Sequence, residues 1–149
     1  MPIIKVIIPA YNEADSISHV IKDIPDSVNE IIVVSNNSTD DTEINATQAG
    51  ATVLKESQKG YGYACLKGME YVSKQETKPD IIVFLDGDYS DYPEELTKIV
   101  QPIIENNVDF VIGSRVKRLR EQGSMTMPQI FGNWLATSLM AIMFKSTFT

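Results

Sequence analysis

A run of five apolar residues at positions 81–85 is followed directly by Asp86, Gly87 and Asp88. This run is too short for a helix with one polar face, but it fits a strand that is buried on both sides of a sheet. Ligands of open α/β sheets bind beyond the carboxyl ends of the strands, so the two aspartates are expected at a binding site. The glycine between them permits a turn and the close approach of a ligand.

Similar apolar runs recur along the chain and alternate with segments of helical periodicity. Further strands are predicted at residues 5–9, 30–34, 51–54 and 109–112. Helices are predicted at residues 17–24, 43–50, 64–74, 93–104 and 128–145. Crossovers of this length indicate right-handed parallel units. The sequence therefore predicts an α/β fold with a mostly parallel sheet flanked by helices on both faces.

The size and charge of the chain narrow the classes of function. With 149 residues, the chain has the size of one domain that can bury a core. Lys and Arg total 13 while Asp and Glu total 20, which gives a net charge of −7. This charge argues against a nucleic-acid partner, because such proteins need cations along the phosphate backbone. An anionic nucleotide would need local help from a metal ion, backbone amides or a few basic side chains.

The termini and the single cysteine bear on the compartment. Residues 1–5 lack the basic region and long apolar core of a signal peptide, and no segment reaches the ~18–20 apolar residues of a membrane span. Cys65 excludes an internal disulfide and lies in an apolar stretch, where core packing is the expected role. We therefore expect a cytoplasmic protein. The chain stops directly after an apolar stretch, so we also expect it to be truncated on its C-terminal side.

Polar or turn-forming residues follow four of the predicted strands directly. These segments are residues 9–13, 35–40, 86–88 and 113–115. Because the carboxyl ends of parallel strands share one edge of a sheet, the four segments are expected to form one composite site. Asp86 and Asp88 offer hard oxygen ligands that suit a divalent cation bridging to a diphosphate. The alternative for these two residues is a strand end capped by ordinary turn chemistry.

Three common kinds of active site do not fit the sequence. The Gly-x-x-x-x-Gly-Lys-Ser/Thr loop of P-loop nucleotidases does not occur. The first predicted strand continues as Ala-Tyr-Asn-Glu at residues 10–13, which is not the Gly-x-Gly-x-x-Gly of a dinucleotide site. A Ser-His-Asp triad would need a serine elbow near His19, and none is present.

Several short motifs, in their order and spacing, resemble glycosyltransferase family 2. They are Ile-Pro-Ala-Tyr-Asn-Glu at 8–13, Val-Ser-Asn-Asn-Ser-Thr-Asp at 34–40, Lys-Gly-Tyr-Gly at 59–62, Leu-Asp-Gly-Asp at 85–88 and Gly-Ser-Arg at 113–115. The match spans residue 3 to about 149, with bacterial enzymes similar to dolichol-phosphate mannose synthases as the closest likeness. The resemblance implies a GT-A fold and a metal-dependent, inverting hexosyltransferase that uses a nucleotide-diphospho-sugar donor.

The resemblance also implies which residues bind the donor. The residues expected along the base and ribose are Pro9, Ala10, Tyr11, Glu13, Ser35 and Asn36, while Lys59, Gly60 and Gly62 are expected to close over the base. At the diphosphate, Asp86 and Asp88 flank Gly87 and are expected to hold Mn²⁺ or Mg²⁺. The metal would offset the charge that grows on the leaving diphosphate as the C1–O bond of the sugar breaks.

Two departures from the family pattern concern specificity and catalysis. The family usually has an aspartate at the position of Ser35, and a serine loses the charge-assisted hydrogen bond to the base, worth ~1.5–3 kcal/mol. Inverting transfer needs a carboxylate that deprotonates the acceptor, and nothing before Thr149 matches it. The catalytic base is therefore unknown and expected beyond residue 149. We expect residues 1–149 to form the nucleotide-sugar-binding domain and to bind donor better than they catalyse transfer.

The acceptor, the partners and two other functions stay open. The apolar helix predicted at 128–145 is typical of a core or a homodimer contact. A lipid-phosphate acceptor would instead favour association with the inner face of a membrane, and another glycan is the alternative acceptor. A non-catalytic nucleotide-sugar-binding module is a second hypothesis. A sugar-1-phosphate nucleotidyltransferase is a third, although residues 10–13 lack the glycine-rich loop that it should carry.

Overall fold

The computed structural model describes residues 2–106, 108–113 and 127–144. The chain divides into two compact units, Met1–Ile112 and Gly113–Thr149. The first unit contains the sheet and the segments in which the sequence places most of the site. Of the predicted site segment 113–115, only Gly113 is described, and residues 114 and 115 lie outside the described residues.

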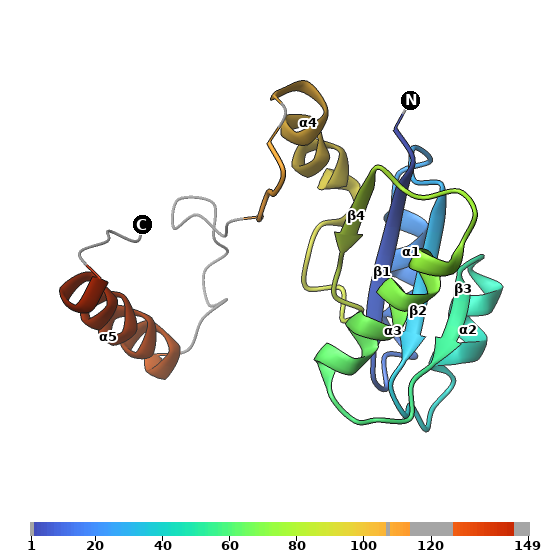
Figure 1. Cartoon of the computed structure of the whole chain (residues 1–149). Coiled ribbons are helices and arrows are strands. Elements are labelled where there is room, and N and C mark those ends of the chain that lie inside the picture. Colours follow the sequence, from blue (N-terminus) through green and yellow to red (C-terminus); the bar gives the residue numbers. More distant parts are fainter. Residues whose placement is uncertain (1, 107, 114–126, 145–149) are drawn as a thin grey trace. The chain divides into compact units, whose positions relative to one another are not determined.

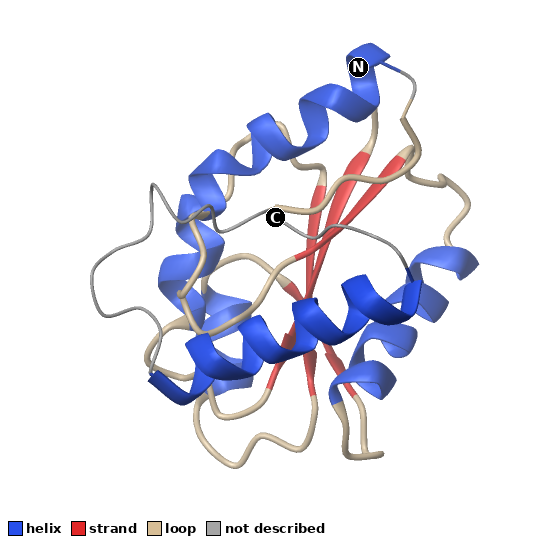
Figure 2. Cartoon of the chain, turned by 90° about the vertical axis from the view of Figure 1, so that its left-hand side faces the viewer, coloured by secondary structure: helices blue, strands red, loops and turns tan. Residues whose placement is uncertain are grey.

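The first unit is built on a four-stranded parallel sheet. Its strands are β1 (Ile4–Ala10), β2 (Glu30–Ser35), β3 (Thr52–Lys55) and β4 (Ile81–Phe84), in the order β3-β2-β1-β4 (Figure 1). The central strand β1 is buried at every position, as expected for a strand covered on both faces. The sheet twists, so that its strands fan out in Figure 2. The predicted parallel sheet is confirmed. The expected burial of strand 81–85 on both sides is wrong, because β4 lies at the edge of the described sheet and exposes Ile82 and Phe84 by 37% and 43%.

Helices cover both faces of this sheet, as the sequence predicts. Helices α1 (Ile17–Asp23) and α2 (Thr42–Gln48) lie on one face, and α3 (Tyr61–Lys74) lies on the other (Figure 1). On the α3 face, Ile7 packs with Ala64 and Val72. A Cβ atom at Gly68 would lie 2.5 Å from Cγ2 of Ile7, so glycine at this position lets the helix approach the sheet closely.

The described chain continues with a short helix and two longer ones. Residues Pro93–Glu95 form the 3-10 helix η1, which leads into α4 (Leu96–Asn106), and Leu96 and Val100 join the core on the α1 side. In the second unit, α5 (Met127–Phe144) exposes Phe131, Trp134, Leu135 and Leu139. Among the described helices, none combines the length and the apolar character needed to cross a bilayer.

Two sequence predictions about secondary structure are wrong. Residues 109–112 do not form a strand, and Phe110 and Ile112 are 75% and 72% exposed. The apolar pattern there fits a strand, but no strand of the described chain pairs with it, and a strand exists only with a hydrogen-bonded neighbour. Helix α3 begins at Tyr61 rather than at residue 64, because Gly60, with φ of 140°, already serves as its N-cap.

Candidate functional site

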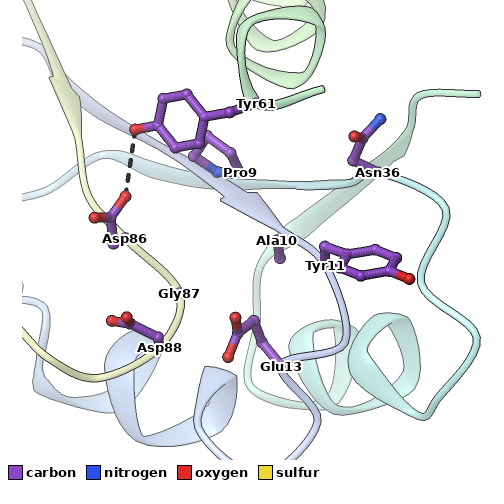
Figure 3. A pocket seen from close by; sticks show the side chains of 9 residues that line it. All are labelled: Pro9, Ala10, Tyr11, Glu13, Asn36, Tyr61, Asp86, Gly87 and Asp88. Atoms are coloured by element: carbon purple, nitrogen blue, oxygen red, sulfur yellow. Dashed lines mark hydrogen bonds between the residues drawn. The ribbon is translucent and has the colours of Figure 1, made fainter. Parts of the chain in front are cut away.

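The loops after β1, β2 and β4 and the start of α3 form one pocket at the carboxyl edge of the sheet (Figure 3). Its described lining residues are Pro9, Ala10, Tyr11, Glu13, Asn36, Tyr61, Asp86, Gly87 and Asp88. The cavity measures about 180 Å³. Small-molecule sites usually have ~300–1,000 Å³, so this cleft holds part of a ligand rather than the whole.

Most of the donor-binding residues predicted from the sequence line this pocket. The exceptions are Ser35, Lys59, Gly60 and Gly62. Ser35 is 1% exposed and pairs in register with Ala10, so its side chain points into the α2 side of the sheet. There its hydroxyl donates a hydrogen bond to Oε1 of Glu43 at 2.9 Å. The hydroxyl is therefore used within the fold, and its contact with a base stays a prediction.

Tyr61 belongs to the motif at residues 59–62, but the sequence predictions give its side chain no role, and it lines the pocket from the first position of α3. Its hydroxyl lies 3.3 Å from Oδ1 of Asp86 and donates a hydrogen bond to it (Figure 3). Burial, and then the charge of Asp86, raise the pKa of Tyr61 to about 12, so the phenol stays a proton donor at neutral pH. The available signal was Gly60, because a glycine N-cap places the next residue at the helix start, beside the end of β4.

The loop after β1 is held by the loop after β2. Thr42, which is fully buried, accepts a hydrogen bond at Oγ1 from the backbone N–H of Glu13 at 2.8 Å. The side chain of Asn12 accepts one from the backbone N–H of Thr39, also at 2.8 Å. Asn12 has φ of 56°, a left-handed conformation that asparagine tolerates better than most residues. These contacts fix the backbone on both sides of Glu13 and next to Tyr11.

The turn that carries the two aspartates is held from α1. Ser16, the N-cap of α1, donates its hydroxyl hydrogen to the carbonyl oxygen of Gly87 at 2.7 Å. Oδ1 of Asp88 accepts a hydrogen bond from the backbone N–H of Ser90 at 2.9 Å. The residue between them, Tyr89, has φ of 60°, which costs energy for a side chain of this size. Such strain directly after Asp88 is typical of a functional turn.

The described lining carries three carboxylates, Glu13, Asp86 and Asp88, and no Lys or Arg. Glu13 and Asp86 alone would repel a diphosphate, since two like charges 4 Å apart interact by ~1–4 kcal/mol between bulk water and a protein surface. Within the described residues, no group of three or more His, Cys, Asp or Glu forms a metal site by itself. One or two carboxylates completed by phosphate and water oxygens are what Mg²⁺ takes, so the donor set fits a divalent cation that binds together with a diphosphate.

Comparison with known sequences places this geometry in a family. The sequence profile of "Glycosyl transferase family 2" matches residues 5–148. The UDP-N-acetylglucosamine–dolichyl-phosphate N-acetylglucosaminyltransferase of Methanococcus voltae is 29% identical over 150 residues, which cover 88% of this chain and 59% of that protein. Glycosyltransferase AglJ of Haloferax volcanii is 34% identical over 129 residues, which cover 86% of this chain and 41% of that protein. The chain thus spans about half the length of these curated relatives.

Solved structures with the same fold carry a metal and a nucleotide. The glucosyl-3-phosphoglycerate synthase of Mycobacterium tuberculosis in complex with Mn²⁺, UDP and glucosyl-3-phosphoglycerate has a TM-score of 0.60 and 33% identity, over 70% of this chain and 40% of that one. The same enzyme has been solved with Mg²⁺ and UDP, with the same TM-score, identity and coverage of both chains. At this level of identity the likeness extends to the sequence as well as to the fold.

Proposed function

The chain belongs to glycosyltransferase family 2, and we propose that it forms the nucleotide-sugar-binding domain of an inverting, metal-dependent glycosyltransferase. The sheet order and the solved neighbours agree with the GT-A fold expected from the sequence. One observation carries the proposal: the aspartates after β4 share a pocket with Tyr11 and Glu13 from the loop after β1 and with Asn36 from the loop after β2.

In this proposal, each side of the pocket binds one part of the donor. Pro9, Ala10 and Tyr11 contact the nucleoside, and Asp86 and Asp88 hold Mn²⁺ or Mg²⁺ at the diphosphate. Bound there, the cation supplies electrostatic stabilisation of the leaving diphosphate. The Mycobacterium tuberculosis synthase structures, which contain UDP with Mn²⁺ or Mg²⁺, support a uridine nucleotide as the first donor to test.

The acceptor and the transfer step are further parts of the proposal. The Methanococcus voltae relative is named for dolichyl phosphate, which supports a lipid-phosphate acceptor. The exposed apolar side chains of α5 support a membrane surface or a second copy of the chain as its contact. All three pocket carboxylates are assigned to the donor side, so no acceptor base is assigned among the described residues. This observation favours one second candidate, a nucleotide-sugar-binding module without turnover.

Thermal unfolding in the presence of nucleotides tests the donor-binding proposal. We expect UDP or a UDP-sugar to raise the unfolding temperature only when Mn²⁺ or Mg²⁺ is present, with EDTA abolishing the shift. A ligand at 100 times its Kd adds about 2.7 kcal/mol of stability, which shifts the midpoint of a domain this size by several degrees. A panel of nucleotides without any metal-dependent shift would refute the proposal. If donor binding is found, an assay for transfer of labelled sugar to a lipid phosphate distinguishes an enzyme, which transfers the sugar, from a binding module, which does not.

A further inference from the structure

Asn36 uses its whole side-chain amide to hold the loop between β3 and α3. The residue is 8% exposed, and its Nδ2 donates hydrogen bonds to the carbonyl oxygens of Glu56 at 3.0 Å and Gln58 at 2.6 Å. Its Oδ1 accepts a hydrogen bond from the backbone N–H of Gly60 at 2.7 Å. Asn37 also holds this loop, through the carbonyl oxygens of Glu56 and Ser57, but the contact with Gly60 at the start of α3 comes from Asn36.

The loop end that Asn36 holds is the point from which Tyr61 reaches across the pocket. Gly60 is the N-cap of α3, and Tyr61 is the first residue of that helix. The hydroxyl of Tyr61 contacts Oδ1 of Asp86. A continuous connection therefore runs from the end of β2, through the start of α3, to the end of β4. In Figure 3, Asn36 and Asp86 lie on opposite sides of the pocket, with Tyr61 between them.

We propose that Asn36 and Tyr61 are positioning residues that act as one unit: Asn36 fixes the start of α3, and Tyr61 thereby holds the Asp86 carboxylate in place for a cation-bound diphosphate. This inference rests on the proposed function and extends it by coupling the nucleoside side of the pocket to its cation side. A carboxylate that is already held by one oxygen loses less freedom when a ligand takes the other. Partners that orient a metal-binding side chain in this way commonly change affinity when they are removed.

Tyr61→Phe removes only the hydroxyl that contacts Asp86. We expect this variant to bind UDP in the presence of Mn²⁺ roughly three- to tenfold more weakly than wild type, measured by isothermal titration calorimetry. The matched control is Tyr63→Phe, because Tyr63 lies on the same helix, is 49% exposed and has no hydroxyl hydrogen bond within the described chain. The control should bind as tightly as wild type. Equal affinities of Tyr61→Phe and wild type, or an equal loss in both variants, would overturn the proposal.

A test of the coupling between Asn36 and Tyr61 needs the Asn36→Ala variant and its combination with Tyr61→Phe. Asn36→Ala should weaken binding at least as much as Tyr61→Phe, and the double variant should be no weaker than Asn36→Ala alone, because the hydroxyl is useless once the helix start is released. Losses that multiply would show two independent residues and overturn the coupling. Asn36→Asp keeps the acceptor for Gly60 but loses both donors, so it provides a second, nearly isosteric test if the alanine variant folds poorly.

The backbone amide NMR signals of the ligand-free protein give a measurement that does not depend on nucleotide binding. Both Asn36→Ala and Tyr61→Phe should shift the amide signals of Gly87 and Asp88, while only the Asn36 variants should speed hydrogen exchange at Gly60. Unchanged signals at Gly87 in both variants would overturn the connection. A wild-type protein that fails to bind UDP with Mn²⁺ would instead refute the proposed function itself, together with the role of the pair in it.

Discussion

The two edges of the sheet both carry charged side chains, but they treat the charge differently. At the amino edge, Lys5 on β1 and Glu30 on β2 form an ion pair of 2.8 Å between Nζ and Oε2. At the carboxyl edge, Asp86 accepts a hydrogen bond from the neutral hydroxyl of Tyr61, and the hydroxyl of Ser16 lies 3.0 Å from Oε2 of Glu13. No cation of the described chain pairs with either carboxylate.

At the amino edge, the charged groups bond to other protein groups. Glu30 accepts further hydrogen bonds from the hydroxyl of Tyr71 at 3.0 Å and from Nε2 of Gln75 at 2.9 Å, and Lys5 is 7% exposed. Burial raises the pKa of Glu30, but the hydrogen bonds from Lys5, Gln75 and Tyr71 outweigh burial and lower it. Within the described residues, no buried side-chain nitrogen or oxygen lacks a partner. The charged groups of Lys5 and Glu30 are therefore committed to the fold.

The difference between the two edges separates the charges that stabilise the fold from the charges that are available for binding. At the amino edge, the fold supplies the counter-charge itself, and protein groups satisfy the cluster around Glu30. Where the pocket opens, neutral hydroxyls contact Glu13 and Asp86 but do not neutralise them. That arrangement leaves their charge for a cation that arrives with the ligand. Substitutions at the amino edge should therefore change the stability of the fold, and substitutions at the carboxyl edge should change the affinity for the nucleotide.

Lys5→Met at the amino edge should have the largest effect. It leaves Glu30 without its cation, and breaking a buried pair costs about 3 kcal/mol, the lower end of the usual range because the Glu30 side chain is 21% exposed. Urea denaturation should show the loss, and UDP affinity at a temperature where the variant is folded should be unchanged. The double variant with Glu30→Gln should recover part of the stability. A variant that lost nucleotide affinity while keeping its stability would break the contrast between the edges.

Asp88→Ala at the carboxyl edge should have the next largest effect, and on affinity instead of stability. Removing a carboxylate that holds the cation should weaken Mn²⁺-supported UDP binding by about 100-fold or more, since even groups that only support a metal ligand change affinity by ~10–100-fold. Calorimetric titration measures the loss. Asp26→Ala, at an exposed aspartate in the loop before β2, is the control and should leave affinity unchanged. Wild-type affinity in Asp88→Ala would remove the cation from the proposal.

Ser16→Ala should produce a smaller effect that appears in both measurements. The hydroxyl of Ser16 ties α1 to the carbonyl oxygen of Gly87, so its loss should cost about 1 kcal/mol of stability and weaken UDP binding a few-fold. Denaturation and titration of the same sample test this expectation. Ser16 is the N-cap of α1 and also holds the turn at Gly87. A change in stability alone, or in UDP affinity alone, would show that this hydrogen bond does not connect the fold to the site.

The contribution of Glu30, at the amino edge, to the pH dependence of stability should be the smallest effect. The folded pKa of Glu30 lies below its ordinary value of 4.5, so its contribution to stability is complete above that value and is lost as the pH falls through the lowered one. The free energy of unfolding should therefore decrease as the pH falls below about 4.5. Glu30→Gln should flatten this decrease. An identical pH profile for the two proteins would show that Glu30 does not titrate with folding.

Much of this fold could be predicted because its strands are unusually plain in sequence. The apolar runs of β1 and β2 leave few alternatives to a parallel sheet covered on both sides. The run of β4 has the same composition, but β4 ends the described sheet and exposes Ile82 and Phe84. Parallel topology then brings the loops after these strands together, which is why Tyr11, Asn36 and Asp86 were expected in one place before the structure was known.

The structure departs from the sequence predictions where the outcome depends on a partner rather than on a pattern. Residues 109–112 have the composition of a strand, yet Phe110 is exposed and no strand among the described residues pairs with this segment. Ser35 ends β2, and its place in the register with Ala10 turns it toward α2, so its predicted contact with a base stays a prediction. Gly60 signals a helix start, but the role of Tyr61 also depends on a contact with Asp86, 25 residues away, which no local pattern predicts.

Mn²⁺ binding followed by electron paramagnetic resonance, with and without UDP, tests the contrast between the edges most directly. If the carboxyl edge leaves its charge for a cation that binds with a diphosphate, UDP should raise Mn²⁺ affinity, and Mn²⁺ should raise UDP affinity by the same factor. Asp86→Asn with Asp88→Asn should abolish both effects, while Glu30→Gln should change neither. A Mn²⁺ affinity that is the same with and without UDP, or that is unchanged when both aspartates are replaced, would contradict this interpretation of the site.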